Sequence, residues 1–278
     1  MAHPHDAQGF WRDPALPFLE ARRVTDGRRV CYAKHSHETF SIGAITGGVS
    51  TYWNQGHEEA VGPGSVVVMN PGDVHACNPI DDRPWSYDML YLDAAWLAGL
   101  QHELEAPAPR DFAMFATRSS AQPGLHRDLT ALCDTLFDPD ATRLARETEA
   151  TAFGLEMQRR LAPRARVAGG DPRGLRRAAD FIDAHCTQAI GLDDICRAAG
   201  LSRSYLVRRF KAHFGLTPHA FLIDRRIRLG RDELRRGRPI AEVAMNCGFA
   251  DQAHFQRTFK RLLAATPGQY AQSLAITR

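Results

Sequence analysis

The sequence predicts an α+β chain of two domains: an N-terminal β-barrel followed by helices, and an all-α C-terminal domain with two helix-turn-helix units. Three observations support this prediction. Short β-rich runs fill residues 20–100, a stretch rich in Pro, Gly and Arg follows the first helical patterns, and one basic, aromatic segment occurs twice near the C-terminus. The length of 278 residues agrees, since a domain typically holds about 100–200 residues.

The composition is that of a globular protein without a secretion or membrane signal. Hydrophobic residues make up 44% of the chain, which is ordinary for a protein with a sizeable core. The six cysteines are scattered without a C-x-x-C pair, which predicts reduced thiols in the cytoplasm rather than a zinc knuckle or a disulfide framework. The first residues, MAHPHDAQGF, contain no apolar h-region, and no run approaches ~18 apolar residues. We therefore expect neither secretion nor membrane insertion.

Charge divides the chain into an acidic and a basic half. Residues 172–278 hold 19 Lys and Arg against 9 Asp and Glu, a net charge of +10. Residues 1–171 hold the remaining 16 basic and 23 acidic residues, a net charge of −7. This asymmetry indicates a polyanionic partner for the C-terminal half, with a merely well-solvated helical surface as the alternative.

Four β-rich runs separated by Gly, Pro and Asn predict the strands of the N-terminal domain, residues 21–100. They are TFSIGAI, STYWN, GSVVVMN and WSYDMLYLD. Short strands with regular turns fit a small antiparallel barrel. In the last run, period-2 alternation places Trp85, Tyr87, Met89 and Tyr91 on one face. These side chains either line a cavity or fill the barrel, and filling is the more common outcome.

The pattern becomes helical in residues 101–162. Four leucines recur there at steps of four, three and four, namely Leu125, Leu129, Leu132 and Leu136. The same spacing counted from Leu144 reaches Thr148, Thr151 and Leu155, so half of the residues on this second helical stripe are polar. These helices either pack on the barrel, pair with a second subunit, or do both. Residues 163–173 are rich in Pro, Gly and Arg and are predicted to be a linker.

The repeated segment lies within residues 174–278, where the pattern is entirely helical. SYLVRRFKAHFGLTP and HFQRTFKRLLAATP share an Arg, a Phe, a Lys, a Thr and a Pro at an offset of 49 positions. Each copy follows the same plan of a short helix, a tight turn and a second helix. Gly200 and Gly248 are predicted to end the short helices, and Ser202 and Asp251 to cap the second ones. This is the plan of a helix-turn-helix, present twice.

Helical spacing separates core-facing from exposed side chains in the two second helices. The core-facing residues are Leu206, Phe210 and Phe214 in the first copy, and Phe255, Phe259 and Leu262 in the second. The exposed residues are the candidates for DNA binding: Arg203, Ser204, Val207, Arg208 and Lys211, then Gln252, Ala253, Gln256, Arg257 and Lys260. Arg pairs with guanine, Gln with adenine, and small or apolar side chains meet the thymine methyl group. The alternative is that Arg208 and Arg257 form internal salt bridges.

At this point the chain resembles the AraC/XylS family of transcription regulators. The resemblance covers about residues 175–272, through LDDICRAAGLSRSYLVRRFKAHFGLTPHAFL and RPIAEVAMNCGFADQAHFQRTFKRLLAATPGQY. It implies two helix-turn-helix subdomains joined by a long helix at about 218–236, with recognition helices at about 203–214 and 252–263. It also implies base contacts at Ser204, Val207, Arg208, Gln252, Ala253, Gln256 and Arg257.

Residues 21–100 resemble the cupin-like effector domain of the same family, through HSHETFSIG and GPGSVVVMNPGDVHACNP. Cupin enzymes hold a metal ion with H-x-H, a glutamate and a later His. His35, His37 and His75 match the His positions, but Ser41 and Ile42 occupy the place of the glutamate. We therefore expect no metal and no cofactor, and His side chains that are pocket walls or hydrogen-bonded barrel residues. The alternative is that three His with an open position bind zinc or iron.

The resemblance to sugar-responsive members of the family implies that the WSYDMLY strand lines the effector cavity. The candidate ligand-binding residues are Tyr87 and Met89, followed by Trp85, His35, His37 and His75. Residues 1–20 are an N-terminal arm, and its segment GFWRDPALPFLE is expected to fold over the barrel mouth as arms do in some members.

The sequence departs from the family pattern at one place. Leu263 and Ala264 precede the second Thr-Pro, where the family usually has Phe-Gly. If Ala264 has a positive φ, the strain costs on the order of 1 kcal/mol. Otherwise this helix ends differently from the first.

The sequence therefore predicts a sequence-specific DNA-binding transcriptional regulator, not an enzyme, that is controlled by a small-molecule effector in the N-terminal barrel. The expected partners are double-stranded DNA and the effector, with RNA polymerase and a second copy of the chain in a homodimer as further partners. Two alternatives stay open: a metal-dependent cupin enzyme with a DNA-binding appendage, and a constitutive architectural DNA binder without an effector.

Overall fold

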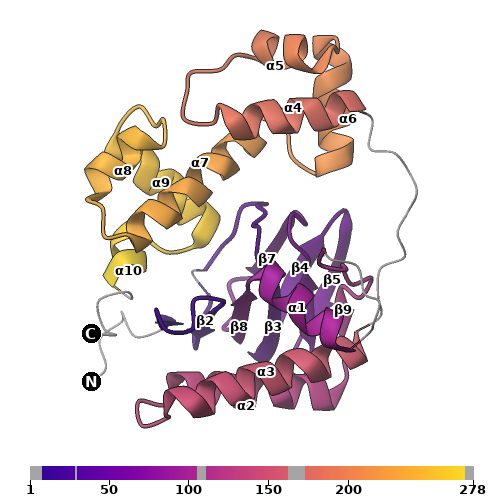
Figure 1. Cartoon of the computed structure of the whole chain (residues 1–278), viewed down its shortest axis with the longest axis vertical. Coiled ribbons are helices and arrows are strands. Elements are labelled where there is room, and N and C mark those ends of the chain that lie inside the picture. Colours follow the sequence, from indigo (N-terminus) through magenta and orange to yellow (C-terminus); the bar gives the residue numbers. More distant parts are fainter. Residues whose placement is uncertain (1–7, 29, 105–110, 162–172, 273–278) are drawn as a thin grey trace. The chain divides into compact units, whose positions relative to one another are not determined.

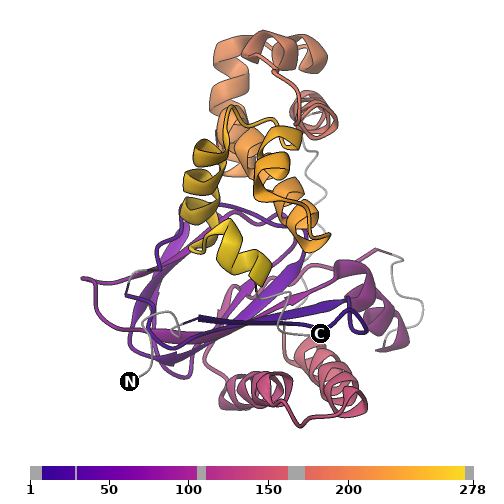
Figure 2. The ribbon, with the colours of Figure 1, turned by 90° about the vertical axis from the view of Figure 1, so that its left-hand side faces the viewer.

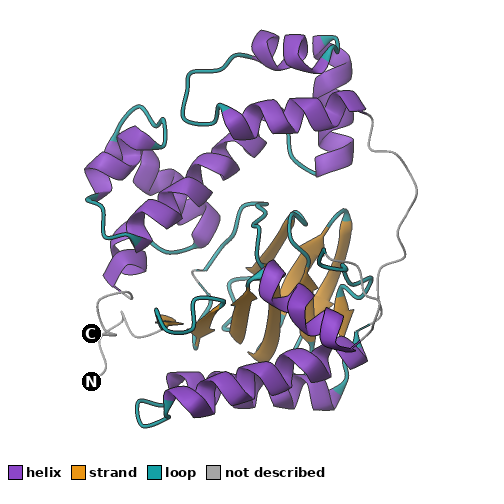
Figure 3. Ribbon diagram, viewed as in Figure 1, coloured by secondary structure: helices purple, strands orange, loops and turns teal. Residues whose placement is uncertain are grey.

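A computed structural model of the chain describes residues 8–28, 30–104, 111–161 and 173–272 (Figure 1). Contacts divide the chain into two compact units. Of the described residues, the first holds 8–28, 30–31, 37–104 and 111–161, and the second holds Tyr32–Ser36 and 173–272. The predicted α+β class is confirmed, because the strands lie in the first unit and the second is helical (Figure 3). Residues 1–7 of the predicted arm, and 163–172 of the predicted linker, lie outside the described residues.

The first unit is built on two antiparallel sheets. One has the strand order β1 (Gln8–Arg12), β2 (Leu19–Val24), β8 (Ser86–Leu92), β3 (Phe40–Gly47), β6 (Val66–Met69) and β9 (Ser119–Ser120). The other has the order β5 (His57–Val61), β4 (Ser50–Asn54) and β7 (His75–Pro79). The four predicted strands are confirmed as β3, β4, β6 and β8.

Part of the segment predicted to be an arm over the barrel mouth forms strand β1. Gln8–Arg12 pairs with β2 over its whole length, from Gln8 opposite Val24 to Arg12 opposite Glu20. Alternation is weak in this segment, because aromatic and charged residues stand next to each other, so no period-2 signal predicts a strand here. The neighbouring β2 supplies the hydrogen bonds that stabilise this edge strand.

A two-residue turn joins β4 to β5. Gln55 and Gly56 both have positive φ, 50° and 87°, as a type I′ hairpin turn requires. The register then places Asn54 opposite His57. The amide of Asn54 donates to the carbonyl of Val68 at 3.1 Å, and thereby ties the smaller sheet to β6.

Helices α1 (Ala94–Leu104), α2 (Pro123–Phe137) and α3 (Arg143–Arg160) cover one face of the six-stranded sheet (Figure 2). The predicted leucine stripe of α2 is confirmed, because all four leucines are buried in this core. The predicted stripe of α3 is wrong: the side chain of Leu144 is 73% exposed. The helix packs instead through Ala150, Phe153, Gly154 and Met157, since Gly154 lets α1 approach closely.

Strand β8 separates two environments. Leu90 and Leu92 lie in the core beneath the helices, while Tyr87 and Met89 are buried on the opposite face, as period-2 alternation predicts. On the helix side, Asp88 accepts two hydrogen bonds from Arg23 of β2, at 2.7 and 2.9 Å. Arg23 also bonds Asp134 of α2 at 2.7 Å, so one guanidinium joins both strands to the helix.

The second unit consists of helices. They are α4 (Arg173–Ala184), α5 (Leu192–Ala199), α6 (Arg203–Phe214), α7 (Pro218–Arg235), α8 (Ile240–Asn246), α9 (Gln252–Leu263) and α10 (Pro267–Gln272). The long helix α7 joins two helix-turn-helix units, α5–α6 and α8–α9, as the resemblance implies (Figure 1). Among the described residues, no helix combines the length and apolar character needed to cross a membrane.

The core-facing residues of both second helices are placed as predicted, with one difference. Leu206, Phe210, Phe255 and Phe259 are fully buried. Phe214 is only half-buried, and its ring lies 4.4 Å from that of Phe210 between centroids.

Candidate nucleic-acid interface and effector site

The turns between the paired helices carry the predicted glycines. Gly200 has a φ of 67° at the end of α5, and Gly248 has a φ of 77° after α8. The predicted cap of α9 is confirmed, since Asp251 Oδ1 accepts from the backbone N–H of His254 at 2.6 Å. Ser202 occupies the N-cap position of α6, but its side chain makes no capping hydrogen bond. Tight, glycine-ended turns fix the angle at which α6 and α9 leave their partners.

Helices α6 and α9 present the candidate DNA-binding residues on their outer faces. In α6, Arg203, Val207 and Lys211 are exposed. In α9 the exposed candidates are Gln252, Ala253, Arg257 and Lys260, and Gln256 is half-buried. The side chains of Ser204 and Arg208 lie outside the described part of the structure. Val207 is exposed, with a relative accessibility of 39%.

The salt-bridge alternative for Arg257 is wrong. Within the described residues, Arg257 is exposed and forms no ion pair. Arg203 differs, because its Nε and Nη2 bond both carboxylate oxygens of Asp193 in α5. The hydrogen bonds from Arg203 lower the pKa of Asp193 below its ordinary value. The sequence analysis did not predict this ion pair. It engages Arg203, which is one of the candidate DNA-binding residues.

The candidate effector site lies on the inner face of the first unit. Met89 packs so closely on β3 that a Cβ at Gly43 would lie 2.6 Å from its terminal methyl group. The rings of His37 and His75 meet edge to face at 4.7 Å, and Tyr91 approaches His37 at 5.7 Å. Trp85 is buried, stacks on Tyr87 at 4.5 Å and donates from Nε1 to the carbonyl of Gly27. Trp85 therefore supports Tyr87 from the core.

Two residues of this face escaped the list of candidates from the sequence. Ser41 is buried, and its Oγ lies 3.4 Å from His37 Nε2. Tyr91 lies on the same period-2 face of the strand as Tyr87 and Met89. This alternation is the sequence signal that could have identified it.

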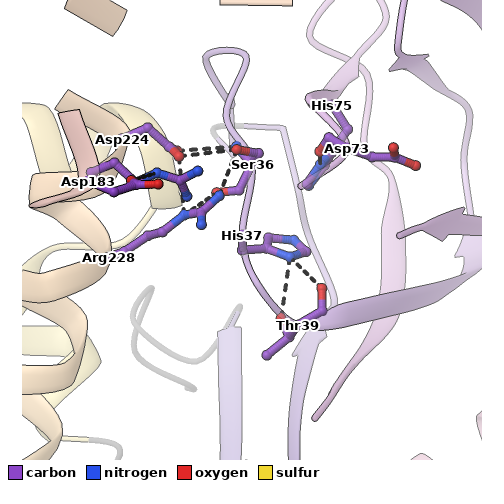
Figure 4. Close-up of polar contacts among 9 residues, drawn as sticks. Ser36, His37, Thr39, Asp73, His75, Asp183, Asp224 and Arg228 are labelled. Carbon is purple, nitrogen blue, oxygen red and sulfur yellow. Dashed lines mark hydrogen bonds and ion pairs between the residues drawn. The ribbon is translucent and has the colours of Figure 1, made fainter. Parts of the chain in front are cut away.

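Backbone carbonyls fix the orientation of the three histidines, of which Figure 4 shows His37 and His75. The Nδ1 atoms of His35, His37 and His75 lie 2.9, 3.0 and 2.9 Å from the carbonyl oxygens of Ala33, Thr39 and Asp73. A carbonyl only accepts, so each Nδ1 carries a proton, and in a neutral imidazole Nε2 is then the acceptor.

These histidines are also the one group among the described residues that offers three potential metal ligands, whose atoms lie within 4.8 Å of one another. His35 stays near His37 because only one residue separates them in the chain. Three neutral imidazoles form a known zinc donor set, but the carboxylate of the cupin pattern is replaced by Ser41. We derive no chemical step through a metal.

Comparison with known families places both units. The model of the AraC-like ligand-binding domain matches residues 21–156, and that of a helix-turn-helix domain matches residues 195–273. The chain belongs to the AraC family of transcription regulators. As a member of that family it carries an N-terminal ligand-binding domain and a C-terminal DNA-binding region, which favours the regulator over the cupin-enzyme alternative.

Relatives and solved structures agree with this assignment. The chain is 26% identical over 248 residues to the uncharacterized HTH-type regulator YbfI of Bacillus subtilis, a match that covers 87% of each chain. It is 41% identical over 80 residues to the regulator MtrA of Neisseria gonorrhoeae, but these are 28% of this chain and 27% of MtrA. The crystal structure of ToxT from Vibrio cholerae superposes with a TM-score of 0.55 over 96% of this AraC-family chain and 97% of ToxT. At 12% identity this likeness shows the shared fold alone.

Proposed function

We propose that this AraC-family protein is a sequence-specific, effector-controlled regulator that reads two successive major grooves with α6 and α9. The observation that carries the proposal is the duplication itself. Both helices occupy the same place in their units, bury the matching residues Phe210 and Phe259, and present mostly polar or small side chains outward. One helix contacts only a few base pairs, so two helices on one chain can read two grooves, ~34 Å apart.

The exposed side chains suggest separate roles. Gln252, Gln256 and Arg257 carry the groups that pair with base edges, and Val207 and Ala253 are suited to thymine methyl groups. Lys211 and Lys260 are exposed at matching positions and are assigned to phosphates. Arg203 joins them when it leaves Asp193. The sequence assigns Ser204 and Arg208 to the same face of α6.

Selection of fragments from the protein's own genome tests this proposal. Fragments that share a motif of two half-sites one helical turn apart are the expected result. Gln256→Ala then relaxes base preference in one half-site, and Val207→Ala in the other. Recovery of fragments without any common motif would contradict sequence-specific reading.

The effector is proposed to bind on the inner face that carries His37, His75, Tyr87 and Met89. Methionine and aromatic surface favours an apolar body, and the Nε2 acceptors favour a ligand hydroxyl or carboxylic acid. ToxT has been solved with an unsaturated fatty acid bound, at 16% identity and a TM-score of 0.54. His35 and Trp85 stay as further candidates, Trp85 through its support of Tyr87.

A thermal-shift screen of sugars, amino acids and organic acids identifies the effector class. A ligand at 100 times its Kd adds ~2.7 kcal/mol of stability. His75→Ala and Met89→Ala should abolish the shift given by the best compound. A constitutive binder without an effector predicts no shift from any class.

We assign the chain no catalytic reaction, since its relatives are transcription regulators. Elemental analysis of the purified protein tests the enzyme alternative, which requires stoichiometric metal. RNA polymerase and a second copy of the chain are proposed partners. The six cysteines are free, which fits a reducing compartment such as the cytoplasm.

A further inference from the structure

Helix α7 joins the first helix-turn-helix, α5–α6, to the second, α8–α9 (Figure 1). Near its start, the ring of Phe221 lies 5.3 Å from that of Phe210 in α6 between centroids. Nearer its end, α7 packs on α9 so closely that a Cβ at Gly230 would lie 2.8 Å from the ring of Phe255. Long helices are rarely straight. The spacing between α6 and α9 therefore depends on what holds the middle of α7.

Arg226 lies in the middle of α7 and binds the connection between α4 and α5. Its Nε donates to the carbonyl of Cys186 at 2.7 Å, and its Nη2 donates to the carbonyl of Gln188 at 2.8 Å. Because the guanidinium is a rigid, planar fork of donors, two bonds to one short segment fix both the distance and the direction of that segment from α7. Helix α4, which precedes the segment, packs on α5 and α6. Arg226 thus holds α7 to the first helix-turn-helix.

The turn of the second helix-turn-helix lies against the same segment, residues 186–188. A Cβ at Gly248 would lie 2.6 Å from the carbonyl oxygen of Thr187 and 3.2 Å from Arg226 Cζ. No side chain fits at 2.6 Å from a backbone oxygen, so this approach requires glycine for space as well as for its φ of 77°. We name residues 186–188, Arg226 and Gly248 the interlock.

The equivalent turn of the first helix-turn-helix lacks such a contact. Gly200 has a φ of 67°, but the nearest atom to a Cβ there would be Arg177 Nη2, at 3.4 Å. The shared plan of the two copies explains why both glycines have a positive φ. It does not explain the missing space at Gly248, which comes from the segment that Arg226 holds.

We propose that the interlock fixes the distance between α6 and α9, and that Arg226 is a positioning residue for the half-site spacing that the protein accepts. Helix α7 is one connection between the two helix-turn-helices, and the interlock is a second one, from the end of α4 to the turn before α9. Two connections remove the freedom to bend about α7. Without the interlock, α6 and α9 still read their half-sites but tolerate different distances between them. The inference rests on the proposed function, because it concerns two half-sites on one duplex.

Duplexes of altered spacing test the proposal. The probes are the fluorescein-labelled fragment selected from the genome and two derivatives, with one base pair inserted or removed between the half-sites. Each change moves a half-site by about a tenth of a helical turn. The full-length wild type should bind the derivatives at least about 10-fold more weakly, an effect comparable to one mismatched base pair. Arg226→Ala should reduce this spacing penalty by at least about 5-fold, the lower end of typical couplings.

Two matched controls separate positioning from stability. Arg225→Ala removes the neighbouring arginine, which pairs with Asp183 of α4 rather than with residues 186–188. It should affect binding of all three duplexes equally, so the spacing penalty keeps its wild-type value. Gly248→Ala and Gly200→Ala both place a side chain at positive φ, but only the first pushes against the segment. Gly248→Ala should therefore lower the spacing penalty, and Gly200→Ala should not.

A folded Arg226→Ala protein with the spacing penalty of the wild type overturns the interlock while leaving sequence-specific reading intact. A wild type that binds all three duplexes equally also overturns it. An equal fall of the penalty in Arg225→Ala and Gly200→Ala would assign the effect to general loss of stability, and the interlock is then wrong. If Arg226→Ala shows no calorimetric transition, Arg226→Gln, which keeps an amide donor, takes its place. A wild type that selects no common motif overturns the proposed function and the interlock together.

Discussion

Ala264 and Gly215 end the two recognition helices in the same left-handed conformation, with φ of 51° and 73°. Each donates its backbone N–H to the carbonyl of a lysine four residues earlier, Lys260 at 2.8 Å and Lys211 at 3.0 Å. The two helices therefore end alike, although only one carries a glycine. The positive φ that the sequence analysis named as a condition for Ala264 is confirmed.

Ala264→Gly should stabilise the second unit by about 0.5–1 kcal/mol. The substitution removes ~1–2 kcal/mol of left-handed strain from the folded state, but glycine also raises the conformational entropy of the unfolded chain, which offsets part of this gain. Gly215→Ala should destabilise the unit by about the same amount. Calorimetry of the variants checks both signs. A lower transition temperature for Ala264→Gly would contradict the strain.

Arg23 bonds one buried and one exposed carboxylate, which makes a matched pair for mutation. The side chain of Asp88 is 5% exposed and that of Asp134 is 73% exposed. Asp88→Ala should destabilise the first unit by roughly 3 kcal/mol, because it leaves a partly buried guanidinium without its main partner. Asp134→Ala should cost about 0–1 kcal/mol, as exposed pairs do.

Urea unfolding followed by tryptophan fluorescence measures this difference. All four tryptophans, at positions 11, 53, 85 and 96, belong to the first unit, so the signal reports that unit alone. Equal losses in the two variants would show that burial does not set the strength of this network.

The elements that the sequence predicted well are those with a local signal. The recognition helices match their predicted ranges because Gly215, Thr217 and Asp251 mark their ends, and Asp251 caps as expected. Helix α7 ends within one residue of its predicted end. Period-2 alternation gave both faces of β8, and the leucine steps gave the buried face of α2.

What the sequence failed to show depends on distant partners. Gln8–Arg12 is a strand because β2 lies beside it, and Leu144 is exposed because Gly154 sets the contact of α3 with α1. In the candidate site, the pairing of Arg203 with Asp193 depends on the turn between α5 and α6. No pattern of periodicity links Arg226 to Cys186, 40 positions away. Such contacts form in tertiary structure and have no local signature.

Arg257 is exposed and unpaired among the described residues, so it is the clearest test of base reading. Arg257→Ala should weaken binding of the selected duplex by ~1–3 kcal/mol and relax preference at one base pair. The same loss is expected for Arg208→Ala, from its equivalent position in the sequence. Arg236→Ala removes an exposed arginine at the end of α7 and should leave specificity unchanged. Specific binding that survives Arg257→Ala in a folded protein excludes this role.

Under the proposed contact of Arg203 with DNA, Asp193 is a competitor for the same guanidinium, so its removal should strengthen binding. Asp193→Asn frees the guanidinium of Arg203 for a phosphate and removes a negative charge beside α6. The slope of log K against the logarithm of the salt concentration should therefore become steeper by roughly one unit. Glu58→Gln, an exposed acid of the first unit, is the charge-matched control. A salt dependence that moves equally in both variants would assign the effect to net charge.

Titration shows whether the pair between Asp193 and Arg203 forms in solution. The pKa of Asp193 is depressed chiefly by the hydrogen bonds from Arg203, so the pair contributes stability above the ordinary carboxyl pKa. That contribution is lost as the pH falls through the lower folded value. Carboxyl NMR should show the pKa of Asp193 rising toward its ordinary value in Arg203→Ala. If the Asp193 pKa is the same in both proteins, Arg203 is not held by this carboxylate and is free to meet DNA without exchange.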